Sequence, residues 1–227
     1  MPSIRIDEHE TIDLLKTLIS INSVNPSLMA DGPGERQIAG HIRAFMESVG
    51  LEVHVTEPEP GRPNVVGLLR ARQKEPGRTL MLNGHTDTVG FGTMDIDPLD
   101  PMERDGRVYG RGSADMKAGV TAMLAAAAAV ARSGLVLRGD LIVAAVADEE
   151  YASIGTEALV RAYTADAAIV TEPTHLDVVI AHKGFAWIDI ETTGRAAHGS
   201  RPDEGIDAIV LMGEVLVALR DLERTTL

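Results

Sequence analysis

The sequence predicts an α/β domain whose largely parallel sheet is flanked by helices, followed by the beginning of a smaller α+β domain. Short apolar segments bounded by Gly and Pro alternate with longer segments whose apolar residues recur at helical spacing. Strands that alternate with helices are typical of a parallel sheet. The pattern changes near Lys183, so we expect a first domain at 1–182 and a second at 183–227.

Two surface helices begin the first domain. The segments 8–20 and 34–49 each carry one apolar stripe at helical spacing. Three strands are expected next, at 51–55, 64–71 and 79–84, because these short apolar runs are bounded by Pro and Gly. Together they begin the sheet.

The second half of the first domain continues the alternation. The alanine-rich segment 116–131 has high helix propensity. The segment 140–147 is almost continuously apolar, which is typical of a strand buried on both faces. A helix at 155–163 and a strand at 167–171 follow. Because functional groups of such sheets lie beyond the carboxyl ends of the strands, we expect the site there.

The second domain is predicted from two segments. Residues 185–193 alternate with period two, which indicates a strand, and 205–222 form a clear amphipathic helix. One strand and one helix are too little to bury two faces independently. We therefore expect 183–227 to be a truncated second domain.

Composition excludes several classes of protein. A net charge of −13 argues against a nucleic-acid partner, because phosphate binding relies on clustered Lys and Arg. The absence of cysteine excludes disulfides and thiolate zinc sites, so any metal must be held by histidine and carboxylates. The N-terminus lacks the apolar core of a secretory signal, so we expect no membrane partner and a cytoplasmic location.

A histidine and several acidic residues stand at the ends of predicted elements. His85 and Asp87 follow the strand at 79–84 and would point the same way in an extended chain. This pair suits a metal ligand and a carboxylate that orients it. Asp115 immediately precedes the helix at 116–131, where the alternative interpretation is an ordinary N-cap.

Two further strands end in carboxylates. The segment 140–147 runs into Glu149 and Glu150, which repel each other unless a cation lies between them. The alternative is an exposed acidic turn. Glu172 ends the strand at 167–171. Histidine with aspartate and glutamates at one edge of an α/β sheet is typical of a two-metal hydrolase.

The motifs that carry these residues resemble a known family. GHTDTV, GRGSADMKAG, DEE, TEPT and GRAAHGSRPDEGIDAI occur along the chain in the order found in the M20 family of metallopeptidases and deacylases, the group of acetylornithine deacetylase, succinyl-diaminopimelate desuccinylase and aminoacylase. The resemblance covers essentially the whole chain. It implies a zinc-peptidase-like catalytic, metal-binding domain at 1–182, which is incomplete because it lacks its C-terminal part, and the beginning of a lid or dimerisation domain at 183–227.

The resemblance also implies a set of metal ligands. His85 and Glu172 would bind one zinc, Glu150 would bind the other, and Asp115 would bridge them. Two zinc ions are usual in the family, although cobalt or manganese suits the same histidine and oxygen ligands. The family supplies a further histidine ligand near its C-terminus, beyond the residues of this chain.

Three other residues receive roles from the resemblance. Asp87 would orient His85, and Glu149 would be the general base for a metal-activated water that attacks the amide carbonyl. His198 would contact the substrate in the active site of a partner subunit, since family members are homodimers.

The expected function is that of a metal-dependent hydrolase that cleaves the amide bond of N-acyl amino acids or small peptides. Acetyl, succinyl, glutamyl and peptide substrates all fit. The first alternative is a non-catalytic or incomplete fragment that binds at most one metal or needs a separate C-terminal half. The second is a metal-free glycosidase using Glu149 and Glu172, which the aromatic content of 3 % disfavours and which leaves His85 and Asp115 without a role.

Overall fold

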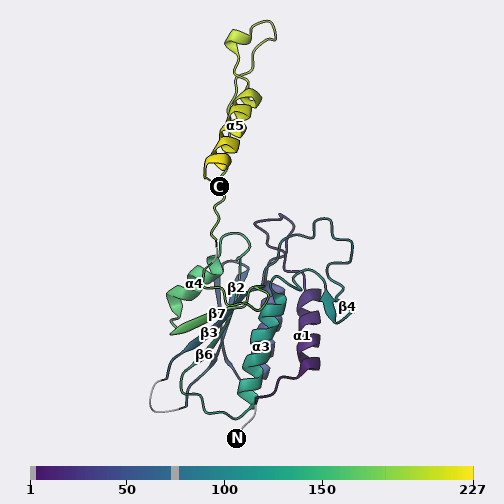
Figure 1. Cartoon of the computed structure of the whole chain (residues 1–227), viewed down its shortest axis with the longest axis vertical. Helices are drawn as coiled ribbons and strands as arrows, with labels where there is room; N and C mark the ends of the chain where they lie inside the picture. The colour runs from purple at the N-terminus through teal and green to yellow at the C-terminus, as the bar shows by residue number, and fades with distance from the viewer. Residues whose placement is uncertain (1–3, 73–76, 182, 227) are drawn as a thin grey trace. The chain divides into compact units, whose positions relative to one another are not determined.

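This computed structural model describes residues 4–72, 77–181 and 183–226 (Figure 1). The chain divides into two compact units, Met1–Val178 and Val179–Leu227. The elements of the first unit are, in chain order, α1 (Glu8–Ser20), α2 (Arg36–Ser48), β1 (Glu52–Glu59), β2 (Arg62–Leu69), β3 (Leu80–His85), β4 (Met102–Arg104), β5 (Arg107–Tyr109), α3 (Lys117–Arg132), β6 (Leu141–Val146), α4 (Ile154–Ala162) and β7 (Ala167–Val170).

The first unit is built on a five-stranded sheet with the order β1-β2-β6-β3-β7. β3 pairs in parallel with both β6 and β7, whereas β2 is antiparallel to its neighbours β1 and β6. β1 therefore runs in the same direction as β6, β3 and β7. The predicted α/β class is confirmed, with β2 as the reversed strand of a mixed sheet.

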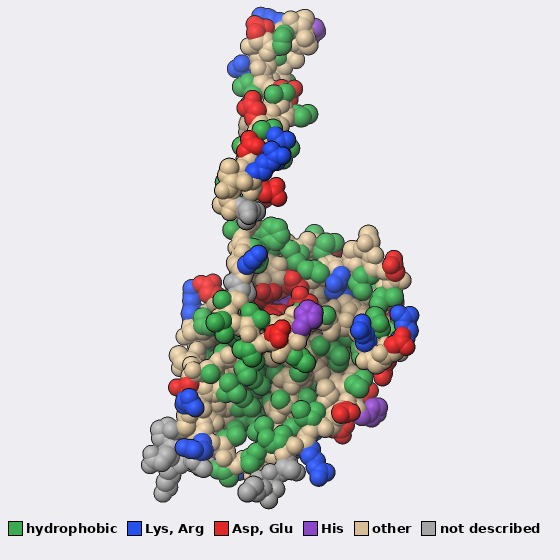
Figure 2. Space-filling view, viewed as in Figure 1, with side chains coloured by type: hydrophobic (Ala, Val, Ile, Leu, Met, Phe, Trp, Pro, Cys, Tyr) green, Lys and Arg blue, Asp and Glu red, His purple; other side chains and the backbone are tan. Residues whose placement is uncertain are grey.

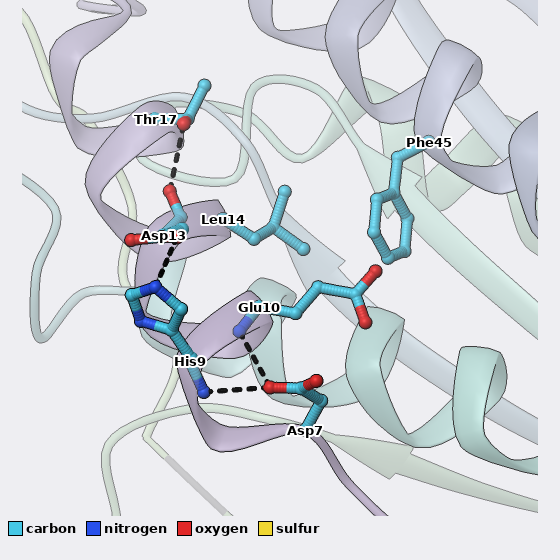
Figure 3. A pocket seen from close by; sticks show the side chains of 7 residues that line it. All are labelled: Asp7, His9, Glu10, Asp13, Leu14, Thr17 and Phe45. Atoms are coloured by element: carbon cyan, nitrogen blue, oxygen red, sulfur yellow. Dashed lines mark hydrogen bonds and ion pairs between the residues drawn. The ribbon is translucent and has the colours of Figure 1, made fainter.

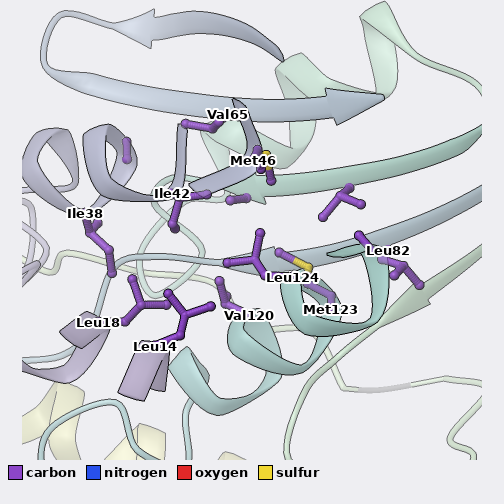
Figure 4. Close-up of a cluster of buried hydrophobic side chains, with 14 of the residues drawn as sticks. Leu14, Leu18, Ile38, Ile42, Met46, Val65, Leu82, Val120, Met123 and Leu124 are labelled. Carbon is purple, nitrogen blue, oxygen red and sulfur yellow. The ribbon is translucent and has the colours of Figure 1, made fainter. Parts of the chain in front are cut away.

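Helices cover both faces of this sheet. On one face α1, α2 and α3 form the larger apolar cluster, in which Leu18, Ile42 and Leu124 are almost completely buried (Figure 4). On the other face Leu159 of α4 packs against β2, β3 and β6. Side chains of β6 alternate between the two clusters, which explains why this strand is apolar at every position.

The predicted elements of the first unit all form. Helix 8–20 has the predicted bounds, and the other helices and strands begin and end within four residues of the predicted positions. The short antiparallel pair β4 and β5 was not predicted. Each of these strands has three residues, which is too short to show a periodic pattern.

The second unit contains a short 3₁₀ helix (Pro202–Glu204) and α5 (Ala208–Thr226), which confirms the predicted helix at 205–222. The prediction of a strand at 185–193 was wrong, because the described residues of this unit offer no strand for it to pair with. None of the unit's described side chains is buried. Residue 182, the last residue of the predicted first domain, lies outside the described residues. The predicted domain boundary between 182 and 183 stays a prediction. No described helix is both long and apolar enough to cross a bilayer.

Candidate metal centre

The carboxyl ends of the parallel strands meet at one edge of the sheet. β3 ends at His85, β6 leads into the turn that carries Glu149 and Glu150, and β7 is followed two residues later by Glu172. Asp115 reaches the same edge from the residues that precede α3. Figure 2 shows acidic side chains gathered on one face of this unit.

The His85 ring lies at the centre of these carboxylates. Its Nε2 atom is 3.1 Å from an oxygen of Asp115, 3.6 Å from Glu149 and 3.8 Å from Glu172. His85 is buried, whereas the three carboxylates are partly exposed. One ligand atom each from His85, Asp115 and Glu172 lies within 4.8 Å of the others. The structure therefore brings together three of the four predicted metal ligands.

The carboxylates of this group repel one another and shift the pKa of the His85 ring between them. Burial acts to lower the pKa of His85, but the neighbouring Asp115, Asp87 and Glu172 outweigh burial and raise it to about 11. The hydrogen bond from His85 in turn lowers the pKa of Asp115. The positive charge on the His85 ring thus balances the same carboxylates that a bound cation would neutralise.

Glu150, the fourth predicted ligand, lies beside this group. Burial raises its pKa to about 7, and the negative charges of Asp115, Asp87 and Glu149 add to the increase. A carboxylate that is disfavoured by like charges at neutral pH is stabilised by a divalent ion. The donor set of one histidine and several carboxylates, without cysteine, therefore fits zinc, cobalt or manganese.

Asp87 connects the histidine to the turn after β6. The His85 Nδ1 atom lies 3.0 Å from the Asp87 backbone oxygen and 3.4 Å from its carboxylate, which leaves Nε2 facing the acidic group. The two carboxylate oxygens of Asp87 also accept the backbone N–H groups of Glu149 and Glu150, each at 3.1 Å. One buried side chain thus fixes the ring and both glutamates.

The backbone around Asp115 and Asp148 directs these side chains. The N-cap of α3 is Met116, and it is not capped by a side chain, so the N-cap interpretation of Asp115 is not supported. Asp115 contacts His85 instead. Asp148 has a φ of 66°, a left-handed conformation that aspartate adopts more readily than most residues. This turn ends β6 and presents the two glutamates that follow.

A buried polar network behind the centre was missed by the sequence analysis. Asn25 donates to Asp87 and Asp148, while Arg62 donates to Glu35 and Asp148. Glu35 lies at the start of the helix predicted at 34–49, whereas Asn25 and Arg62 lie between predicted elements. The sequence contains no signal that these residues meet.

His198 belongs to the second unit. Its side chain is exposed, and its Nδ1 atom is 2.9 Å from the Ser200 hydroxyl and accepts the Ser200 backbone N–H. Its predicted contact with substrate stays a prediction.

A separate hollow of about 450 Å³ lies at the start of α1 (Figure 3). Its charged side chains already have protein partners: Asp7 caps α1 by accepting the N–H groups of His9 and Glu10, His9 pairs with Asp13, and the Glu10 carboxylate pairs with Arg132 of α3. The residues that line the hollow do not include any predicted ligand. The strand-end centre is therefore the better candidate for chemistry.

Several known proteins have similar sequences. The model of "Peptidase family M20/M25/M40" matches residues 81–217. Acetylornithine deacetylase from Vibrio vulnificus is 35% identical over 218 residues, which cover 94% of this chain and 56% of that protein. N-formyl-4-amino-5-aminomethyl-2-methylpyrimidine deformylase from Bacillus subtilis is 32% identical over 237 residues, which cover 97% and 54%. The chain thus spans about half the length of these relatives.

Solved structures share the fold. A tripeptidase from Staphylococcus aureus superposes with a TM-score of 0.64 at 21% identity, covering 93% of this chain and 56% of that one. An M20 family metallo-carboxypeptidase from Sulfolobus solfataricus gives 0.60 at 21% identity, covering 73% and 37%. Because the family model matches more than half of the chain, the resemblance seen in the motifs is confirmed, and the chain belongs to peptidase family M20/M25/M40.

Proposed function

We propose that this chain supplies the metal centre of a hydrolase that cleaves the amide bond of N-acyl amino acids or small peptides. The observation that carries the proposal is the convergence of His85, Asp115 and Glu172 within 4.8 Å, with Glu149 beside them. The relatives described above, a deacetylase and a deformylase, support a small acylated substrate.

His85, Asp115, Glu150 and Glu172 are the residues that would hold the metal ions, with Asp115 between them. When bound, a divalent ion supplies Lewis acidity, which polarises the amide carbonyl and favours deprotonation of an attacking water. Buried Asp87 holds the His85 ring so that Nε2, rather than Nδ1, faces the site. Zinc is the proposed metal.

Glu149 is proposed as the general base. Its carboxylate is partly exposed and lies 3.6 Å from His85 Nε2, so it borders the group of ligands while remaining open to substrate. It would accept a proton from the attacking water and deliver it to the leaving amine. The Asp87 bond to its backbone N–H fixes the position from which it acts.

The test is amine release from a panel of N-acyl amino acids and dipeptides, with the metal-free protein and after addition of zinc or cobalt. We expect activity to require metal and to fall by about 10²–10⁴-fold in Glu149→Gln. Glu157→Gln is the matched control, since Glu157 is exposed on α4 and pairs with Arg161. Activity that persists without metal, or that survives Glu149→Gln, would contradict the proposal.

A second candidate is that the chain binds metal but needs a separate polypeptide for turnover. The coverage of about half of each relative favours it. In that case zinc or cobalt would bind without amine release. A homodimer, a substrate contact by His198 and a cytoplasmic location remain predictions.

A further inference from the structure

Asn25 lies between two buried carboxylates behind the candidate metal centre. Its Nδ2 atom donates to Asp87 Oδ2 at 2.7 Å and to Asp148 Oδ1 at 2.9 Å. All three side chains are 0–1 % exposed. Two carboxylates that share one neutral amide are held at a fixed separation without an added charge, and water has no access to replace the amide.

The orientation of the amide is determined by its third contact. Asn25 Oδ1 accepts the backbone N–H of Ser27 at 2.9 Å, so the oxygen must face Ser27 and the nitrogen must face the carboxylates. The backbone of Asn25 is held by the segment that follows β3, because its N–H donates to the Thr88 carbonyl at 2.9 Å. Its donor is therefore aimed by a rigid frame.

Both carboxylates lead directly to proposed active-site groups. Asp87 contacts the His85 ring and accepts the N–H groups of Glu149 and Glu150. Asp148 is the left-handed residue of the same turn. Arg62 donates at 2.8 Å to Asp148 Oδ1, the same oxygen that accepts from Asn25, and is itself paired with Glu35. The charge of Asp148 is thus compensated by Arg62, while Asp87 depends on Asn25, His85 and the turn.

We infer that Asn25 is a positioning residue: by binding Asp87 and Asp148 together, it sets the orientation of His85 and of the turn that presents Glu149 and Glu150. For its effect on metal binding, the inference rests on the proposed function. The side-chain hydrogen bonds of Asn25 go to Asp87, Asp148 and Ser27, none of which is a proposed metal ligand. Removal of its amide should loosen the turn and the ring together, because both depend on the same Asp87 carboxylate.

The test compares Asn25→Ala with the wild-type chain by two measurements. In the metal-free protein, amide hydrogen exchange at Glu149 and Glu150 should be about tenfold faster, as expected when their acceptor is freed, relative to exchange at Val143 in the centre of β6. Titration with cobalt, followed by visible absorption, should show binding weaker by about 10–100-fold and an altered spectrum. Asn22→Ala is the control, since Asn22 lies in the same loop and its side chain accepts the Val24 N–H.

The outcomes separate the two proposals. If wild-type protein takes up no cobalt, the proposed function fails, while the exchange rates still decide the role of Asn25. The inference would be overturned if exchange at Glu149 and Glu150 in Asn25→Ala were unchanged, or were raised only as much as at Val143. If the wild-type chain binds cobalt, equal cobalt binding by Asn25→Ala would overturn it as well. If Asn25→Ala does not fold, Asn25→Ser keeps one short donor and should give intermediate values on the same scale.

Discussion

The Arg62 guanidinium is the buried cation that compensates the carboxylates behind the metal centre. Its Nε and one terminal nitrogen bind the two Glu35 oxygens at 2.6 and 2.7 Å, and the same terminal nitrogen reaches Asp148 at 2.8 Å. Burial raises the pKa of Glu35 even though Arg62 and the bonds to it act to lower the pKa. Burying the Arg62–Glu35 pair therefore costs free energy. Removing Arg62 alone would cost more, because the buried carboxylates of Glu35 and Asp148 would remain without a cation.

Replacement of this cation gives a prediction at the residue scale. We expect Arg62→Met to lower the free energy of unfolding by about 3–5 kcal/mol, the typical cost of removing one partner of a buried ion pair. Urea denaturation of the metal-free protein measures it. Arg43→Ala is the matched control: Arg43 forms an exposed pair with Glu47 on α2, and such pairs contribute about 0.3–0.5 kcal/mol. Equal effects of the two substitutions would show that the buried network contributes no more than a surface pair.

At the scale of elements, α3 packs unusually close to the end of β7. A Cβ atom at Gly119 would lie 2.1 Å from the Thr171 carbonyl oxygen, so only glycine permits this approach. Thr171 directly precedes Glu172 and donates its N–H to Asn83 on β3. The first turn of α3 therefore follows Asp115 directly and packs against Thr171, the residue before Glu172.

This contact predicts opposite effects for two glycines in helices. Gly119→Ala should displace the Thr171 backbone, destabilise the fold and weaken cobalt binding, because Glu172 moves with Thr171. Gly40→Ala in α2, where nothing lies within 4 Å of the added Cβ, should instead stabilise the fold by about 0.5–1 kcal/mol. Thermal melts and cobalt titrations of both variants provide the measurements. Wild-type cobalt affinity in Gly119→Ala would show that the position of Glu172 does not depend on the contact between Gly119 and Thr171.

The elements differ in how well their sequence pattern predicts them. The segment 140–147 is predictable because an apolar run of that length, followed by carboxylates, fits a buried strand that ends at a polar edge. Residues 185–193 show the period of a strand, yet no strand forms, since alternation does not supply a partner for the backbone hydrogen bonds. β4 and β5 have three residues each and give no periodic signal.

At the scale of the whole molecule, the proposed metal ligands could be predicted from the sequence, whereas the residues that position them could not. His85, Asp115 and Glu172 could be selected from the sequence because each follows or precedes a recognisable element. Asn25 and Arg62 could not, because their partners are 27 to 123 positions away and only the folded chain brings them together. Local pattern reveals a ligand at a strand end, whereas the residues that hold the ligand depend on tertiary packing.

The division of the chain into two units gives the last prediction. All proposed ligands, both apolar clusters and the Arg62 network lie within Met1–Val178. The described part of Val179–Leu227 contains no buried side chain, and α5 leaves large apolar residues such as Ile209 and Leu216 exposed. Residues 1–178 alone should therefore keep the unfolding free energy of the whole chain to within about 0.5 kcal/mol, the range of changes remote from the core.

The chain shortened to residues 1–178 should bind cobalt as tightly as the 227-residue chain, since no proposed ligand is removed. Removal of the exposed apolar residues of α5 should also reduce any self-association of the longer chain, because exposed apolar patches promote contacts between molecules. Urea denaturation, cobalt titration and sedimentation of both chains test these points. A tenfold loss of cobalt affinity on truncation would mean that residues after 178 hold the ligands in place, and that the centre is not carried by the first unit alone.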